Sequence, residues 1–205
     1  MSDNEIVFYH NPRSRAQMAH WMLEEAGAPY RIVPVDFEKR EHKDPGFLAL
    51  NPMGKLPTIV HRGVVVTETA AIIAYIADAF PQAGLAPATT DPARGAYYRW
   101  LFFGAGCFEP ALLDTMMKRP PLESKTMVGY GSYEDVVGTL KTALARGPYL
   151  LGETFTAADV YIGSEINWSM MFGAPGLKGE PVFDDYVARL TARPAYRRVA
   201  AASKP

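Results

Sequence analysis

The stretch that decides the fold is residues 5–27, with the sequence EIVFYHNPRSRAQMAHWMLEEAG. Residues 6–10 form a short apolar run of β-forming side chains, about the length of a buried strand. From Ser14 onward the apolar residues recur at helical intervals, and Gly27 is a typical stop signal. A strand that passes into an amphipathic helix predicts the start of an α/β domain.

The following segments extend this unit. Residues 30–37, YRIVPVDF, predict a second strand, and residues 56–68 predict two short strands around a turn at Arg62 and Gly63. A helix is expected over residues 69–80, before Pro81. The order β-α-β and then β-β-α predicts two parallel strands joined by a crossover helix, followed by an antiparallel hairpin.

Beyond this unit the composition changes. Residues 82–91 are rich in proline, glycine and alanine, which is typical of a linker. The remaining chain has helical patterning, including one long helix over residues 93–118 that we expect to bend at Pro110. We therefore predict an α/β domain over residues 1–81, the linker, and an all-helical domain over residues 92–205.

The composition restricts the partners and the compartment. A net charge of -1 over 205 residues gives no general attraction to nucleic acid or to an anionic membrane. No segment approaches the roughly 18 apolar residues of a membrane span, and the acidic N-terminus is unlike a secretory signal. The single cysteine, Cys107, cannot form an internal disulfide, so we expect a cytoplasmic protein. We expect no metal, because the four histidines lack zinc-like spacing: His10, His20, His42 and His61.

Four stretches together carry a family resemblance, through their order and spacing. They are FYHNPRSRAQMAHWMLEEAG (8–27), NPMGKLPTIV (51–60), TETAAIIAYIAD (67–78) and YLLGETFTAADVYIG (149–163). On these residues the chain resembles the cytosolic glutathione transferases, most closely the bacterial type. The resemblance implies a thioredoxin-like N-terminal domain, an all-α C-terminal helical bundle, and a homodimer. It also implies a role in detoxification, with glutathione as co-substrate bound mostly by the first domain.

Glutathione has two carboxylates, one ammonium and one thiol, and the sequence offers groups for its two ends. Pro57 resembles the family's cis-proline, and the backbone of Leu56 would then pair with the cysteinyl part of glutathione. The alternative is a trans proline that only opens a strand. Glu68 and Thr69, at a predicted helix start, would hold the γ-glutamyl end, or serve only as an ordinary helix cap.

The second carboxylate should meet a cation after the second strand. We favour Lys55, next to the Leu56–Pro57 segment, and then His42. Lys39, Arg40 and Lys43 are further candidates, although a charged connection of this kind is usually a solvated loop.

The thiol needs a group that favours its ionised form. Ser14 fits a capping box with Gln17, and its hydroxyl could also face the thiolate. A free thiol has a pKa of about 8.5, so a hydrogen bond at a helix N-terminus would raise its ionised fraction. Arg15 stands where some bacterial members have cysteine, which argues against mixed-disulfide chemistry. Asn11, Arg15 and Tyr9 remain alternative catalytic residues, although Tyr9 lies within an apolar strand.

The predicted activity is attack by the glutathione thiolate on an electrophilic, largely apolar small molecule. Two alternatives stay open: a non-catalytic ligand-binding or protein-interaction scaffold, and a glutathione-dependent peroxidase. Thr156 and Asp159 form a capping pattern that we interpret as structural. An aromatic stripe on a bundle helix is more often core, but candidates for the second-substrate pocket are Phe102, Phe103, Cys107 and Trp168.

Overall fold

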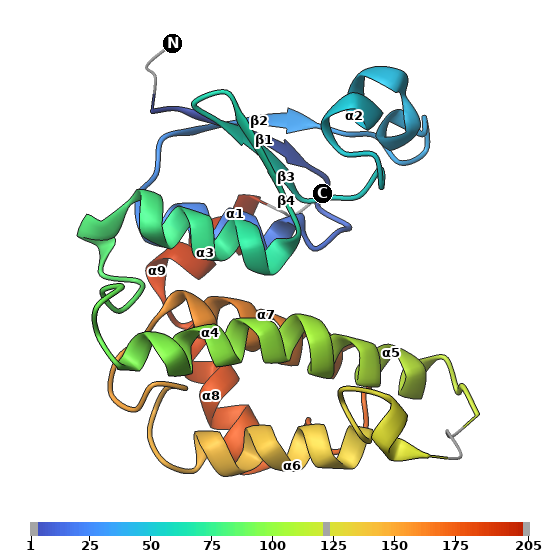
Figure 1. Ribbon diagram of the computed structural model, residues 1–205, viewed down its shortest axis with the longest axis vertical. Helices are drawn as coiled ribbons and strands as arrows, with labels where there is room; N and C mark the ends of the chain where they lie inside the picture. Colours follow the sequence, from blue (N-terminus) through green and yellow to red (C-terminus); the bar gives the residue numbers. More distant parts are fainter. Residues whose placement is uncertain (1–3, 121–123, 203–205) are drawn as a thin grey trace. The chain divides into compact units, whose positions relative to one another are not determined.

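A computed structural model describes residues 4–120 and 124–202 of the chain (Figure 1). The chain divides into two compact units. One unit contains the residues up to Leu85 together with those from Arg193 onward, and the other runs from Ala86 to Ala192.

The first unit is built on a four-stranded mixed sheet. Its strands are β1 (Ile6–His10), β2 (Tyr30–Pro34), β3 (Thr58–His61) and β4 (Val64–Thr67), in the order β2-β1-β3-β4. β1 and β2 are parallel, whereas β3 is antiparallel to both β1 and β4. The parallel pair and the hairpin predicted from the sequence are thereby confirmed, as is the α/β class of this unit.

Two helices cover one face of the sheet (Figure 1). They are α1 (Ala16–Ala26) and α3 (Thr69–Ala79), which pack against each other. Alternate residues of β1 point toward them, and Ile6 and Phe8 are fully buried. Gly27 ends α1 with φ 59°, a left-handed conformation that glycine adopts without steric cost.

On the opposite face of the sheet, the segment that follows β2 contacts Tyr9 of β1. This segment contains the short 3₁₀ turn η1 (Glu41–Lys43) and the helix α2 (Pro45–Leu50). Phe47 of α2 lies edge-on against Tyr9 of β1, with the ring centres 5.5 Å apart. A further 3₁₀ turn, η2 (Pro81–Ala83), follows α3.

The last helix, α9 (Pro194–Ala202), packs against α1 of the first unit. The Arg193 guanidinium donates two hydrogen bonds to the Glu25 carboxylate, at 2.7 and 2.8 Å. The Tyr196 ring lies edge-on to Trp21 with centres 5.2 Å apart. The sequence-based division placed this helix with the helical domain, because its amphipathic pattern gives no information on which partner it covers.

The second unit is helical, as the sequence predicted. Its helices are α4 (Ala93–Phe103), α5 (Glu109–Met116), α6 (Tyr133–Leu144), α7 (Ala157–Met171) and α8 (Pro181–Thr191), with a 3₁₀ turn, η4 (Lys125–Met127), before α6.

α4 and α5 are joined by a π-helical turn, η3 (Gly104–Phe108), and Pro110 lies in the first turn of α5. The expected bend at Pro110 is therefore replaced by an irregular turn just before it. A Cβ atom on Gly104, at the start of η3, would lie 2.6 Å from the Tyr161 ring of α7, so this close approach requires a glycine. Proline is tolerated in a first helical turn, where its missing N–H is not needed.

The capping box at the start of α7 is confirmed. The fully buried Asp159 carboxylate accepts hydrogen bonds from the Thr156 N–H and hydroxyl, at 2.9 and 3.2 Å. It also accepts from the Leu150 N–H at 2.8 Å and the Tyr186 hydroxyl at 2.9 Å. Burial raises the pKa of Asp159, and these donors oppose the rise by stabilising the charged form.

Candidate active site

The strand register brings three predicted site segments to one end of the sheet. Tyr9 of β1 pairs with Thr58 of β3, and Thr58 pairs with Thr67 of β4. The segment that ends in Pro57 therefore lies beside the start of the β1–α1 loop on one side and beside Glu68 on the other. Residues separated by up to about 60 positions in sequence are thus neighbours at this end of the sheet.

Asn11 organises the loop between β1 and α1. Its buried side chain donates a hydrogen bond to the Val35 carbonyl at 2.8 Å and accepts one from the Arg13 N–H at 2.9 Å. Its backbone carbonyl accepts from the Ser14 N–H at 3.1 Å and from the Ser14 hydroxyl at 2.7 Å.

Ser14 lies just before α1, not at its N-cap. The helix begins at Ala16 with Arg15 at the N-cap, so the predicted capping box of Ser14 with Gln17 is wrong. The tight turn after Asn11 shifts the serine out of the cap position. The Ser14 hydroxyl oxygen still accepts a hydrogen bond from the Ala16 N–H at 3.2 Å, and thereby satisfies one donor of the helix start.

The other two thiolate candidates differ in their surroundings. Arg15 is half-buried at the N-cap of α1. Tyr9 is half-buried on the sheet face that Phe47 covers, opposite the face of the sheet on which α1 lies.

The segment before β3 contains the expected cis peptide bond between Leu56 and Pro57. The buried Asn51 side chain donates to the Lys55 carbonyl at 2.9 Å, and the Thr58 hydroxyl donates to the same carbonyl at 3.1 Å. Leu56 is buried and Lys55 is exposed. Internal hydrogen bonds therefore hold the backbone on which the cysteinyl part of a tripeptide is expected to pair.

Glu68 is the N-cap of α3 and has an unusual backbone conformation, with φ 66° and ψ 121°. Non-glycine residues rarely adopt positive φ, and such strain is concentrated at functional sites. The carboxylate of Glu68 is exposed, and Thr69 follows at the first position of the helix. Unpaired N–H groups and the positive end of the dipole at this helix start suit an anion.

The structure brings the two preferred carboxylate-binding cations to adjacent segments. Gly54, next to Lys55, has φ 61°, and a Cβ atom there would lie 2.6 Å from the His42 carbonyl oxygen. The Lys43 ammonium donates to the Met53 carbonyl at 3.2 Å, which ties η1 to the same turn. His42 Nδ1 is buried and has no hydrogen-bond partner within residues 4–120 and 124–202.

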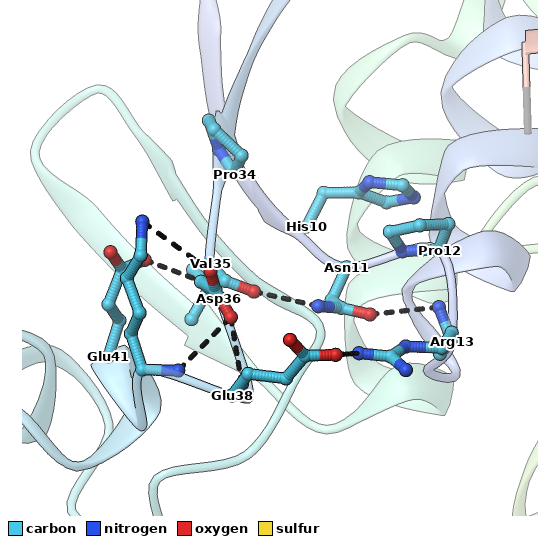
Figure 2. A pocket seen from close by; sticks show the side chains of 10 residues that line it. His10, Asn11, Pro12, Arg13, Pro34, Val35, Asp36, Glu38 and Glu41 are labelled. Carbon is cyan, nitrogen blue, oxygen red and sulfur yellow. Dashed lines mark hydrogen bonds and ion pairs between the residues drawn. The ribbon is translucent and has the colours of Figure 1, made fainter. Parts of the chain in front are cut away.

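A cavity of about 500 Å³ lies between the β1–α1 loop and the connection after β2 (Figure 2). Arg13 and Glu38 form an ion pair between these two loops at 3.0 Å, with both side chains exposed. Two of the lining residues were predicted from the sequence: Asn11 as a thiolate candidate, and Lys39 as a further candidate for the second carboxylate, on a charged connection of the kind that is usually a solvated loop. The residues that line the cavity are His10, Asn11, Pro12, Arg13, Pro34, Val35, Asp36, Glu38, Lys39 and Glu41.

Polar aromatic residues lie beneath this loop, between the sheet and α1. His20 Nε2 lies 2.8 Å from the Tyr30 hydroxyl, which donates to Glu24 at 2.6 Å. The His10 and His20 rings are edge-on to each other, with their centroids 5.3 Å apart. Burial, with a contribution from His10, lowers the pKa of His20 to about 4, and burial also lowers the pKa of His10. Both rings are therefore neutral at physiological pH and add no positive charge near the loop.

The predicted second-substrate residues belong to the second unit, on α4, η3 and α7. The Phe103 ring packs edge-on to the Trp100 ring with centroids 5.4 Å apart, and the Trp168 and Phe172 rings have centroids 4.7 Å apart. Phe102 is 73% exposed, and the Cys107 thiol lies 3.6 Å from the Gly129 carbonyl. That these four residues line a common pocket for the second substrate stays a prediction.

Between residues 4 and 120 and between 124 and 202, no group of three or more His, Cys, Asp or Glu side chains is arranged to hold a metal ion. No helix in these same ranges is long and apolar enough to cross a membrane.

Comparisons with known proteins agree with this geometry. The family model "Glutathione S-transferase, N-terminal domain" matches residues 5–78. Glutathione S-transferase 3 of Schizosaccharomyces pombe is 30% identical over 75% of this chain and 70% of that protein. Glutathione S-transferase GST-4.5 of Xanthomonas campestris is 28% identical over 91% of this chain and 93% of that protein. A glutathione transferase homologue from Sulfitobacter, solved with bound glutathione, has a TM-score of 0.76 and 28% identity, covering 97% of this chain and 98% of that one.

Proposed function

Because the chain belongs to the glutathione S-transferase family, we propose that it binds glutathione and directs its thiolate onto an electrophilic, largely apolar small molecule. The observation that carries this proposal is the register that joins Tyr9, Thr58 and Thr67 across the sheet. This register brings the β1–α1 loop, the Leu56–Pro57 segment and the start of α3 to one end of the sheet. Three groups suited to three parts of glutathione therefore lie side by side.

The two ends of the tripeptide would meet groups that complement their charges. The γ-glutamyl carboxylate would lie at the N-terminus of α3, bonded by the Thr69 hydroxyl, with Glu68 facing the ammonium. Strain at Glu68 supports this role, because a residue that served only as a cap would not need positive φ. The glycyl carboxylate would meet Lys55 and His42, whose segments touch through Gly54. The cysteinyl part would pair with the backbone of Leu56.

Ionisation of the thiol would depend on Ser14 and the start of α1. Lowering a thiol pKa by about two units requires roughly 2.7 kcal/mol. A hydrogen bond to a charged group contributes about 1.5–3 kcal/mol, whereas the neutral bond from the Ser14 hydroxyl to the Asn11 carbonyl contributes about 0.5–1.5 kcal/mol. The hydroxyl therefore gains by rotating from that carbonyl to a bound thiolate. The helix N-terminus would add about 0.3–1 kcal/mol.

The test combines calorimetry with glutathione, conjugation of a generic aryl halide, and titration of the bound thiol. Ser14→Ala should raise the thiol pKa and slow conjugation. Ser132→Ala is the matched control, because Ser132 caps α6 by accepting from the Asp135 N–H at 3.2 Å. Ser132→Ala should lose about 0.5–2 kcal/mol of stability as a lost N-cap, and Ser14→Ala about 0.5–1.5 kcal/mol for each neutral hydrogen bond that its hydroxyl makes. Only Ser14→Ala should change the pKa of the bound glutathione thiol.

Each alternative function has its own outcome in this test. Absence of glutathione binding at millimolar concentration would favour a scaffold and contradict the proposal. Reduction of an organic peroxide without conjugation would favour the peroxidase. An unchanged thiol pKa in Ser14→Ala would leave the transferase intact and move the thiolate contact to Asn11, Arg15 or Tyr9.

Three broader expectations complete the proposal and rest on family membership. The protein would be a homodimer, which light scattering of the purified chain tests directly. It would act in the cytoplasm, where glutathione is abundant and thiols stay reduced. Its role would be detoxification, with the electrophile held partly by Phe102, Phe103, Cys107 and Trp168.

A further inference from the structure

We infer that Asn11 is a positioning residue that acts on the thiol through Ser14, without touching the sulfur itself. The inference rests on the proposed function and deepens it. It reassigns a side chain whose amide, from the sequence alone, could equally be a direct donor to the thiolate.

The side chain of Asn11 is already engaged at both ends. The amide nitrogen donates to the Val35 carbonyl at 2.8 Å, and the amide oxygen accepts from the Arg13 N–H at 2.9 Å. Figure 2 shows these two bonds running from Asn11 in opposite directions. Asn11 is 7% exposed, so its bond to Val35 is shielded from competing water and its bond from the Arg13 N–H is partly shielded. Turning the amide toward a ligand would leave the buried Val35 carbonyl without this donor, which is unfavourable.

The backbone carbonyl of Asn11 controls Ser14 directly. It accepts from the Ser14 N–H at 3.1 Å and from the Ser14 hydroxyl at 2.7 Å. The hydroxyl oxygen in turn accepts from the Ala16 N–H at 3.2 Å. The bond from the Ser14 N–H to the Asn11 carbonyl fixes the serine backbone, and this bond remains when the hydroxyl turns from that carbonyl to a thiolate. A displacement of the Asn11 backbone moves the hydroxyl relative to the helix start.

The Asn11–Val35 bond also joins two parts of the proposed site. Val35 directly follows β2, and the chain then continues through residues 36–41 to His42. Asn11 therefore couples the loop that holds Ser14 to the segment that holds a proposed carboxylate ligand. A second side-chain link between the same two loops, from Arg13 to Glu38, is exposed, with side-chain exposures of 67% and 78%. Water competes with that ion pair, so the pair should contribute little to holding the two loops together.

The experiment is a double-mutant cycle of Asn11→Ala and Ser14→Ala, read by the pKa of the bound glutathione thiol and by kcat. Asn11→Ala alone should raise the thiol pKa and lower kcat at neutral pH about tenfold. In the Ser14→Ala background the same change should have little further effect, because the residue acts through the serine. Glu38→Ala, which removes only the exposed link, should leave both quantities unchanged.

Two results would overturn the inference. One is an equal loss from Asn11→Ala with and without Ser14, which would show direct contact with the thiolate. The other is an unchanged thiol pKa in Asn11→Ala. If that variant does not fold, Asn11→Ser carries the same cycle, since a serine hydroxyl can still accept from the Arg13 N–H but is too short to reach Val35. Failure of the wild-type protein to bind glutathione would instead contradict the proposed function.

Discussion

His20 makes the stability of the first unit dependent on pH. The ring is 5% exposed and lies against His10, Tyr30 and Glu24. Its pKa is about 4 in the folded protein against 6.5 for the free side chain. Between these values the unfolded chain binds a proton that the folded chain excludes, so stability falls as the pH falls. The shift of about 2.5 units corresponds to roughly 3 kcal/mol between pH 8 and pH 4.

The perturbation is His20→Gln, which keeps an N–H donor for Tyr30 and removes the titration. Urea unfolding at a series of pH values would give the free energy of unfolding for each protein. The wild type should lose about 3 kcal/mol more than the variant between pH 8 and pH 4. Its loss should level off below about pH 4, where both states bind the proton. Parallel curves for the two proteins would refute the reasoning, because His20 would then titrate normally in the fold.

Three further predictions concern packing and pairing. Asp159→Ala should lower the free energy of unfolding by about 3–5 kcal/mol, because buried donors lose their acceptor; a loss under about 1 kcal/mol in urea unfolding would contradict this. Gly104→Ala should lose about 1–3 kcal/mol against a tyrosine ring of α7, whereas Gly106→Ala, with open space around its Cβ, should be neutral or stabilising in thermal unfolding. Arg193→Ala should leave the carboxylate of Glu25, 7% exposed, without its bidentate partner and speed amide exchange in α9; unchanged exchange would argue against this anchor.

The architecture could be predicted because local patterns repeat along the chain. The alternation in β1, the left-handed stop at Gly27, and the capping box before α7 are local features. The packing of α9 against α1 could not be predicted in this way. An amphipathic pattern shows that one face of a helix is covered but not by what, and the pairing of Arg193 with Glu25 joins positions far apart in sequence.

The site was predicted in outline and corrected in detail. Ser14 was expected at the N-cap, but the turn closed by the Asn11 carbonyl places it one residue earlier. The connection after β2 resembled a solvated loop, because a run of charges is usually exposed. Most of its charged side chains are exposed, but Asp36 and Glu41 accept hydrogen bonds from backbone N–H groups within that connection, and both line the cavity. Only three-dimensional contacts reveal charges used in this way.

A crystal structure of the protein with glutathione would test the central claim most directly. The account predicts the γ-glutamyl carboxylate at the start of α3 beside Thr69, the cysteinyl backbone on Leu56, and the sulfur within hydrogen-bond distance of the Ser14 hydroxyl. Glutathione bound away from this edge of the sheet, or with its sulfur far from the start of α1, would contradict it.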